Sequence, residues 1–122
     1  MKHISDNRGD TGGIVMNNKL RDDKNLNDLY NAILCLETVE ECYDFFEDLC
    51  TVLELKSLSQ RLQVAKMLTE KHVYSDIVAE TGASTATISR VNRSINYGCD
   101  GYALVFGRMK EKEKSENKSE NE

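Results

Sequence analysis

A helix-start signature occurs twice within a continuous helical pattern, from Thr38 to Glu41 and from Thr51 to Glu54. In this T-x-x-E capping box, the Thr hydroxyl and the Glu carboxylate each accept a hydrogen bond from a backbone N–H of the helix start. The boxes therefore predict that one helix ends before Thr38, that a second follows, and that a third begins at Thr51 and runs to about Glu70. A chain divided in this way has to pack short helices against one another.

Apolar residues recur at helical spacing in each of the segments that the capping boxes separate. The first stripe comprises Leu26, Leu29, Tyr30, Ile33 and Leu34, and the second comprises Cys42, Phe45, Phe46 and Leu49. The third comprises Leu55, Leu58, Leu62, Ala65 and either Met67 or Leu68. The chain has no proline and only 7% aromatic residues, a composition that suits helices better than strands. These observations predict an all-α fold.

Two more helices with a glycine between them come next. A short helix is predicted over Ser75–Thr81, Gly82 breaks it at a position suited to a left-handed residue, and a longer helix runs over about 84–96. The longer helix is expected to bury Ile88, Val91 and Ile95. Gly101–Met109 is predicted to be a last short helix.

One domain over residues 22–109 accounts for all of these helices. Residues 1–21 show no period, and we expect a mobile arm there, which could include a leader that is not native. Residues 110–122 alternate Lys and Glu, and we expect a solvated tail, either frayed helix or coil. The first two helices are short and rich in apolar residues, so a partner subunit is expected to cover them.

Small side chains follow Gly82 directly, in the stretch TGASTATISR. A short helix, a turn containing glycine and a second helix are typical of a helix-turn-helix, whose second helix reads bases in the major groove. Hydroxyl groups can pair with donors or acceptors on base edges, and the methyl groups of Thr and Ala can contact the thymine methyl. The predicted base-reading residues are Ser84, Thr85, Ala86, Thr87 and Ser89.

The charge of the chain is unevenly distributed around its total of −5. Residues 22–55 contain ten acidic residues against Lys24 alone, a net charge of −9, whereas residues 56–96 carry a net charge of +3. Affinity for phosphates normally comes from a basic surface, so DNA contacts are expected in the second segment. The predicted contacts to the DNA backbone are Lys56, Arg61, Lys71, Arg90 and Arg93.

A simpler interpretation of GASTATIS is an ordinary helix start, with Ser84 as the N-cap and Ala as a good helix former. Two features also depart from the common helix-turn-helix pattern. Val78 stands four residues before Gly82, where Ala is usual, and Asp76 and Glu80 place negative charge on the first helix of the motif. The coincidence of the motif with the basic segment favours DNA binding.

The segments CTVLELKSLSQRLQVAKMLTE and ETGASTATISRVNRSINYG resemble the Trp repressor-like superfamily, and most closely its YerC/YecD-type branch of bacterial regulators. The similarity covers roughly residues 25–108. The resemblance implies a Trp repressor-like helical domain with a helix-turn-helix. It also implies an intertwined homodimer, in which the N-terminal helices of one subunit pack on the other and two helix-turn-helix units face successive major grooves of double-stranded DNA.

The Trp repressor holds tryptophan between two arginines, with a glycine beside the indole ring. Position by position, one arginine matches Arg90, the other falls on Gln60, and the glycine falls on Val91. Gln60 offers no positive charge, and a Val side chain would fill the space of the indole. Tryptophan is therefore not expected as a corepressor, and whether another small molecule replaces it stays open.

The sequence thus predicts a cytoplasmic, homodimeric transcriptional regulator, a repressor that binds a two-fold symmetric operator through the helix 84–96. The chain shows no enzyme motif and no expected cofactor or metal site. Its cysteines, expected to be buried free thiols, are Cys35, Cys42, Cys50 and Cys99. Two alternatives stay open: a dimeric helical protein-interaction module without specific DNA contact, and a helix-turn-helix that binds DNA without sequence preference.

Overall fold

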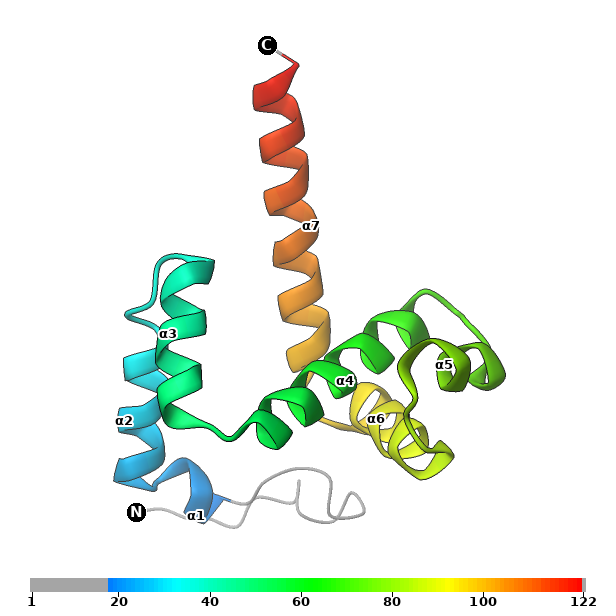
Figure 1. Ribbon diagram of the computed structural model, residues 1–122, viewed down its shortest axis with the longest axis horizontal. Coiled ribbons are helices and arrows are strands. Elements are labelled where there is room, and N and C mark those ends of the chain that lie inside the picture. The colour runs from blue at the N-terminus through cyan, green and yellow to red at the C-terminus, as the bar shows by residue number, and fades with distance from the viewer. Residues whose placement is uncertain (1–17, 122) are drawn as a thin grey trace. The chain divides into compact units, whose positions relative to one another are not determined.

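The structure, a computed structural model, describes residues 18–121. These residues form α-helices and no strand, which confirms the all-α prediction (Figure 1). The helices are α1 (Asn18–Arg21), α2 (Lys24–Ile33), α3 (Val39–Leu49), α4 (Val52–Thr69), α5 (Tyr74–Thr81), α6 (Thr85–Tyr97) and α7 (Gly101–Glu120). Within the described residues, no helix combines the length and the apolar character that a membrane crossing requires.

The chain divides into two compact units at the boundary between Gln60 and Arg61. Helix α4 continues through this boundary, so its first half belongs to one unit and its second half to the other. The two units differ in how well they bury apolar side chains. Each is described separately below.

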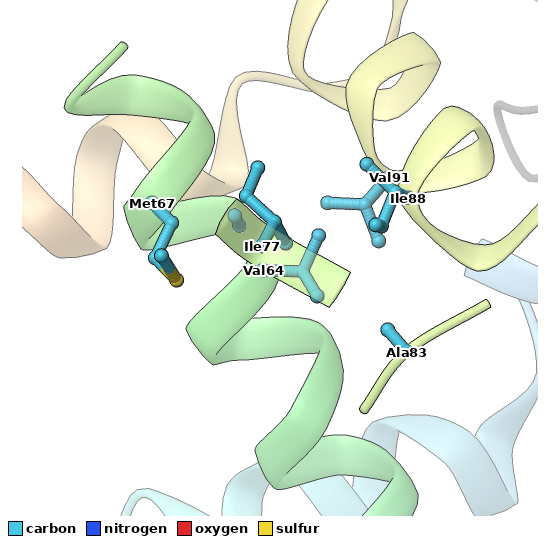
Figure 2. Packing of buried hydrophobic residues seen from close by; sticks show 7 residues of the cluster. Val64, Met67, Ile77, Ala83, Ile88 and Val91 are labelled. Carbon is cyan, nitrogen blue, oxygen red and sulfur yellow. The ribbon is translucent and has the colours of Figure 1, made fainter. Parts of the chain in front are cut away.

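The second unit contains a hydrophobic core formed by the end of α4, by α5 and by α6 (Figure 2). Its side chains, each at most 6% exposed, are Val64, Ala65, Met67, Ile77, Ala83, Ile88 and Val91. Leu68, Ile95, Tyr102 and Phe106 pack around this core and are partly buried. The two residues contributed by α6, Ile88 and Val91, lie one turn apart, so the core contacts a single face of that helix.

Gly82 forms the turn between α5 and α6 in the left-handed conformation that the sequence predicted, with φ of 72°. Its N–H donates to the carbonyl of Val78, and the Thr81 hydroxyl accepts a hydrogen bond from the N–H of Ala83 at 3.1 Å. Ala83 itself is buried in the core. The turn is therefore fixed by backbone geometry, hydrogen bonds and burial together.

Helix α4 begins with a complete capping box and ends in a tight turn. The Thr51 N–H donates to Glu54 Oε1 at 2.8 Å, and the Glu54 N–H donates to Thr51 Oγ1 at 3.1 Å. At the other end, Lys71 has φ of 69°, and the His72 N–H donates to the Met67 carbonyl. This is a Schellman-type ending with a lysine where glycine is most common.

The first unit buries none of its side chains between Leu20 and Gln60. Its α2 and α3 begin at the N-caps Asp23 and Thr38, so local helix signals are satisfied. Several apolar residues are nevertheless strongly exposed, including Leu34 at 80% and Leu53 at 79%. The apolar stripes of α2 and α3 are at most partly buried, which is less than the burial that normally stabilises helices in proteins.

The cysteines are free, as expected, but they are not buried. Cys35 and Cys99 are exposed, and Cys42 and Cys50 are partly exposed. Three of the four belong to the first unit, which fully buries no side chain between Leu20 and Gln60. The prediction of buried thiols is therefore wrong for the single chain.

Helix α7 is longer than the predicted Gly101–Met109 helix, because it continues to Glu120. Its first turns carry Tyr102 and Phe106, whose rings stack with centroids 5.9 Å apart beside the core. All its residues from Gly107 onward are exposed. The predicted arm over 1–21 falls mostly outside the described residues, and its last four residues form α1.

Substituting glycines at two contrasting positions tests the role of the turn. Gly82→Ala should destabilise the protein by about 1–2 kcal/mol, because a Cβ disfavours the left-handed conformation although nothing lies within 4 Å of it. Gly107→Ala in α7, also without a neighbour within 4 Å, should instead stabilise by roughly 0.5–1 kcal/mol. Equal effects of the two substitutions in chemical denaturation would contradict this account of the turn.

The α4 capping box makes stability depend on pH. Hydrogen bonds from the Thr51 backbone N–H, and then from its side chain, lower the pKa of Glu54 below its ordinary value of 4.5. The ionised carboxylate therefore stabilises the helix start above pH 4.5, and this contribution is lost as pH falls through the lowered pKa. Wild type should unfold at a higher temperature than Glu54→Gln at neutral pH, and the gap should close on acidification; a constant gap would argue against the box.

Candidate nucleic-acid interface

One stripe of α6 points away from the core of the second unit. Ile88 and Val91 are buried, whereas Ala86, Ser89, Arg90 and Arg93 are exposed. These four exposed residues stand at i, i+3, i+4 and i+7, the spacing of one helix face. We call Ala86, Ser89, Arg90 and Arg93 the outer stripe; Thr85, also exposed, lies at its edge, four residues before Ser89.

The start of α6 is capped by Ser84, whose hydroxyl accepts a hydrogen bond from the Thr87 N–H at 3.1 Å. The N–H groups of Thr85 and Ala86 have no hydrogen-bond acceptor within residues 18–121. Unpaired N–H groups at a helix start, together with the helix dipole, favour an anion such as phosphate. The first turn of α6 thus combines small side chains with free backbone donors.

Arg90 and Arg93 extend the outer stripe one to two turns further along α6. Both are exposed, and neither forms an ion pair with any residue of the described chain. The hydroxyls of Thr85 and Ser89 likewise have no hydrogen-bond partner there. The outer stripe therefore presents two cations and unpaired hydroxyls to solvent, which are groups that can bind phosphate and base edges.

The other predicted contacts to the DNA backbone are more widely spread. Arg61 and Lys71 belong to the second unit, with Arg61 half-buried on α4 and Lys71 in the turn after it. Lys56 is exposed on the part of α4 that belongs to the first unit. The structure therefore brings Arg90 and Arg93 together on α6 and places the remaining three basic residues on or next to α4.

The positions compared with the tryptophan site of the Trp repressor also differ in environment. Val91 is 2% exposed and is part of the core, whereas Gln60 is half-buried at the end of the first unit. The side chain of Val91 contacts the interior of the protein. A ring-shaped ligand at that position would have to displace a core residue.

A hollow of about 430 Å³ lies between the end of α4 and α5. It is lined by Gln63, Met67, Glu70, His72, Asp76, Ala79 and Glu80. Three carboxylates against one histidine make its lining acidic, and His72 Nε2 lies 3.7 Å from Glu70 Oε1. Such a surface repels phosphates, so the acidic face of α5 noted in the sequence does not favour DNA contact.

Residues 18–121 contain no group of three or more histidine, cysteine or carboxylate side chains arranged to hold a metal ion. The groups of the outer stripe are hydroxyls, a methyl and guanidinium groups. These groups can bind by hydrogen bonds and by charge.

Comparison with known proteins agrees with this geometry. The family model described as Trp repressor protein matches residues 24–110. The uncharacterised protein YerC of Bacillus subtilis strain 168 is 58% identical over 90 residues, covering 74% of this chain and 86% of YerC.

Two solved structures are similar in fold as well as in sequence. A TrpR-like protein from Eubacterium eligens superposes with a TM-score of 0.73 at 60% identity, over 76% of this chain and 95% of that one. A candidate Trp repressor from Staphylococcus aureus superposes with a TM-score of 0.74 at 54% identity, over 78% of this chain and 95% of that one. The helix-turn-helix geometry, the family match and these relatives together show that the chain belongs to the Trp repressor family, in its YerC branch, a family of DNA-binding regulators.

Proposed function

We propose that the protein is a cytoplasmic, sequence-specific transcriptional repressor that binds a two-fold symmetric operator as a homodimer. The observation that carries this proposal is the outer stripe of α6, which turns unpaired hydroxyls and two unpaired arginines toward solvent opposite the buried Ile88 and Val91. A helix fixed by its inner face and polar on its outer face is suited to lie in the major groove.

In this proposal the residues at the start of α6 meet base edges and the basic residues meet phosphates. The base-contacting set is Ser84, Thr85, Ala86, Thr87 and Ser89, and the phosphate-contacting set is Lys56, Arg61, Lys71, Arg90 and Arg93. The free N–H groups of Thr85 and Ala86 add donors for a phosphate at the same end of the helix. No corepressor is proposed, and tryptophan is disfavoured because Val91 belongs to the core.

A homodimer is supported by the first unit, which buries no side chain between Leu20 and Gln60. The exposed apolar side chains of this unit would be buried if they packed against another apolar surface. A second copy of the chain offers the same surface, so the two copies can pack on each other. The acidic residues of the segment 22–55 would then lie on the dimerisation part of the protein, away from the phosphates. This arrangement reconciles a net charge of −5 with DNA binding.

The alternative function is a protein-interaction module. The acidic first unit and its exposed apolar residues favour it, because the same surface could hold a partner of another sequence. Selection from a random duplex library separates the two functions. A palindromic consensus with half-sites about one helical turn apart would support the repressor; recovery of unrelated sequences would contradict sequence-specific binding.

Arg90→Ala should weaken binding to the selected duplex by about 1–3 kcal/mol and reduce the slope of log affinity against log salt by about 1. Arg108→Ala on α7 removes the same charge away from the outer stripe and should leave both quantities unchanged. Fluorescence anisotropy titrations at several salt concentrations measure both quantities. Equal losses for the two variants would show that α6 has no special part in binding.

Dimerisation is tested by introducing the same polar residue at an apolar and at a polar position of α4. Leu53→Asn should shift the protein toward monomer in sedimentation equilibrium and lower its unfolding midpoint, since Leu53 is 79% exposed in the single chain and buried in the proposed dimer. Ser59→Asn, also on the exposed surface of α4, should do neither. A wild-type protein that sediments as a monomer at micromolar concentration would contradict the proposal.

A further inference from the structure

Both hydrogen-bonding functions of the Ser84 side chain are directed at Thr87. Ser84 Oγ accepts a hydrogen bond from the Thr87 N–H at 3.1 Å and donates one to Thr87 Oγ1 at 3.1 Å. A hydroxyl has one proton and two lone pairs, so the proton and one lone pair are already used. Turning Ser84 toward a base would break these bonds and leave the Thr87 N–H without its partner.

Thr87 lies on the inner side of α6. It stands next to Ile88 and one turn before Val91, both of which are buried, and Thr87 itself is half-buried. The Thr87 hydroxyl oxygen accepts a hydrogen bond from the Ser84 hydroxyl, and this bond holds the Thr87 side chain beside the helix start. By contrast, Thr85, Ala86 and Ser89 are exposed, and their side chains form no hydrogen bond within residues 18–121.

From this pairing we infer that Ser84 and Thr87 are positioning residues that do not read bases, and that base recognition rests on Thr85, Ala86 and Ser89. The inference depends on the proposed function and narrows its base-contacting set, from which it removes Ser84 and Thr87. The Ser84–Thr87 pair closes the first turn of α6 and so fixes the direction of the side chains and free N–H groups of Thr85 and Ala86. A first turn that is already ordered loses less freedom when it meets DNA.

The inference is tested with two variants that each delete one hydroxyl, Ser84→Ala and Ser89→Ala, and with the conservative variant Ser84→Thr. Without DNA, amide hydrogen exchange by NMR reports the protection of the Thr87 N–H. With DNA, titrations against the selected duplex and a scrambled duplex at equal salt report affinity and specificity, and repeated library selection reports base preference.

For Ser84→Ala we expect faster exchange at Thr87, a loss of about 2- to 30-fold in affinity for the selected duplex, and unchanged affinity for the scrambled one. The selected consensus should stay the same, and Ser84→Thr should restore protection and affinity because it restores the capping oxygen. For Ser89→Ala we expect normal protection at Thr87 and an altered base preference at one position of each half-site.

A changed consensus for Ser84→Ala, with the Thr87 N–H still protected from hydrogen exchange, would overturn the inference, because Ser84 would then contact a base directly. Unchanged affinity of Ser84→Ala for the selected duplex, or no rescue by Ser84→Thr, would overturn it as well. Failure of the wild-type protein to select any DNA sequence would instead refute the proposed function. The hydrogen-exchange result without DNA does not depend on that outcome, so the two failures are distinguishable.

Discussion

The burial of Ile88 and Val91 against Val64 and Ile77 is the interaction on which the rest of the second unit depends. These side chains fix the rotation of α6 about its own axis, and the rotation decides which residues face solvent. With the inner face fixed, Ala86, Ser89, Arg90 and Arg93 have to point outward. The proposed recognition surface is thus determined by the core on the opposite face of α6, and Gly82 supplies the turn that lets α6 reach this core.

The two units obtain their stability in different ways. The second unit has a core of its own, whereas the first has well-capped helices whose apolar stripes are at most partly buried. Capping and propensity alone rarely hold short helices in water, which is why we propose that a second copy of the chain covers the first unit. In a homodimer, the segment of negative charge and the segment of positive charge would serve separate tasks, one joining two chains and the other meeting phosphates.

Much of the fold could be predicted because its signals are local. The box at Thr51 and Glu54 fixed the start of α4, and Gly82 marked the break between α5 and α6. The periodicity of α6 predicted the burial of Ile88 and Val91. The extension of α7 to Glu120 could not be predicted in this way, because its Lys- and Glu-rich end carries no apolar residue and hence no periodic signal.

The candidate site was predictable as a segment but not side chain by side chain. A run of small residues after Gly82 predicts a recognition helix, yet the sequence does not decide whether Ser84 caps the helix or reads bases, and Thr85 and Thr87 look equivalent in it. Their difference lies in the rotation of the helix and in the hydrogen bonds between Ser84 and Thr87. The sequence did offer Ser84 as the N-cap of an ordinary helix start, and that interpretation competed with the one of Ser84 as a base-reading residue.

An NMR titration of the ¹⁵N-labelled protein with its selected duplex shows whether the outer stripe of α6 is the DNA-binding surface. We expect the largest chemical-shift changes at Thr85, Ala86, Ser89, Arg90 and Arg93, and only small changes at Asp76 and Glu80 in the acidic lining of the hollow. Large changes confined to α2 and α3, with α6 unaffected, would contradict it.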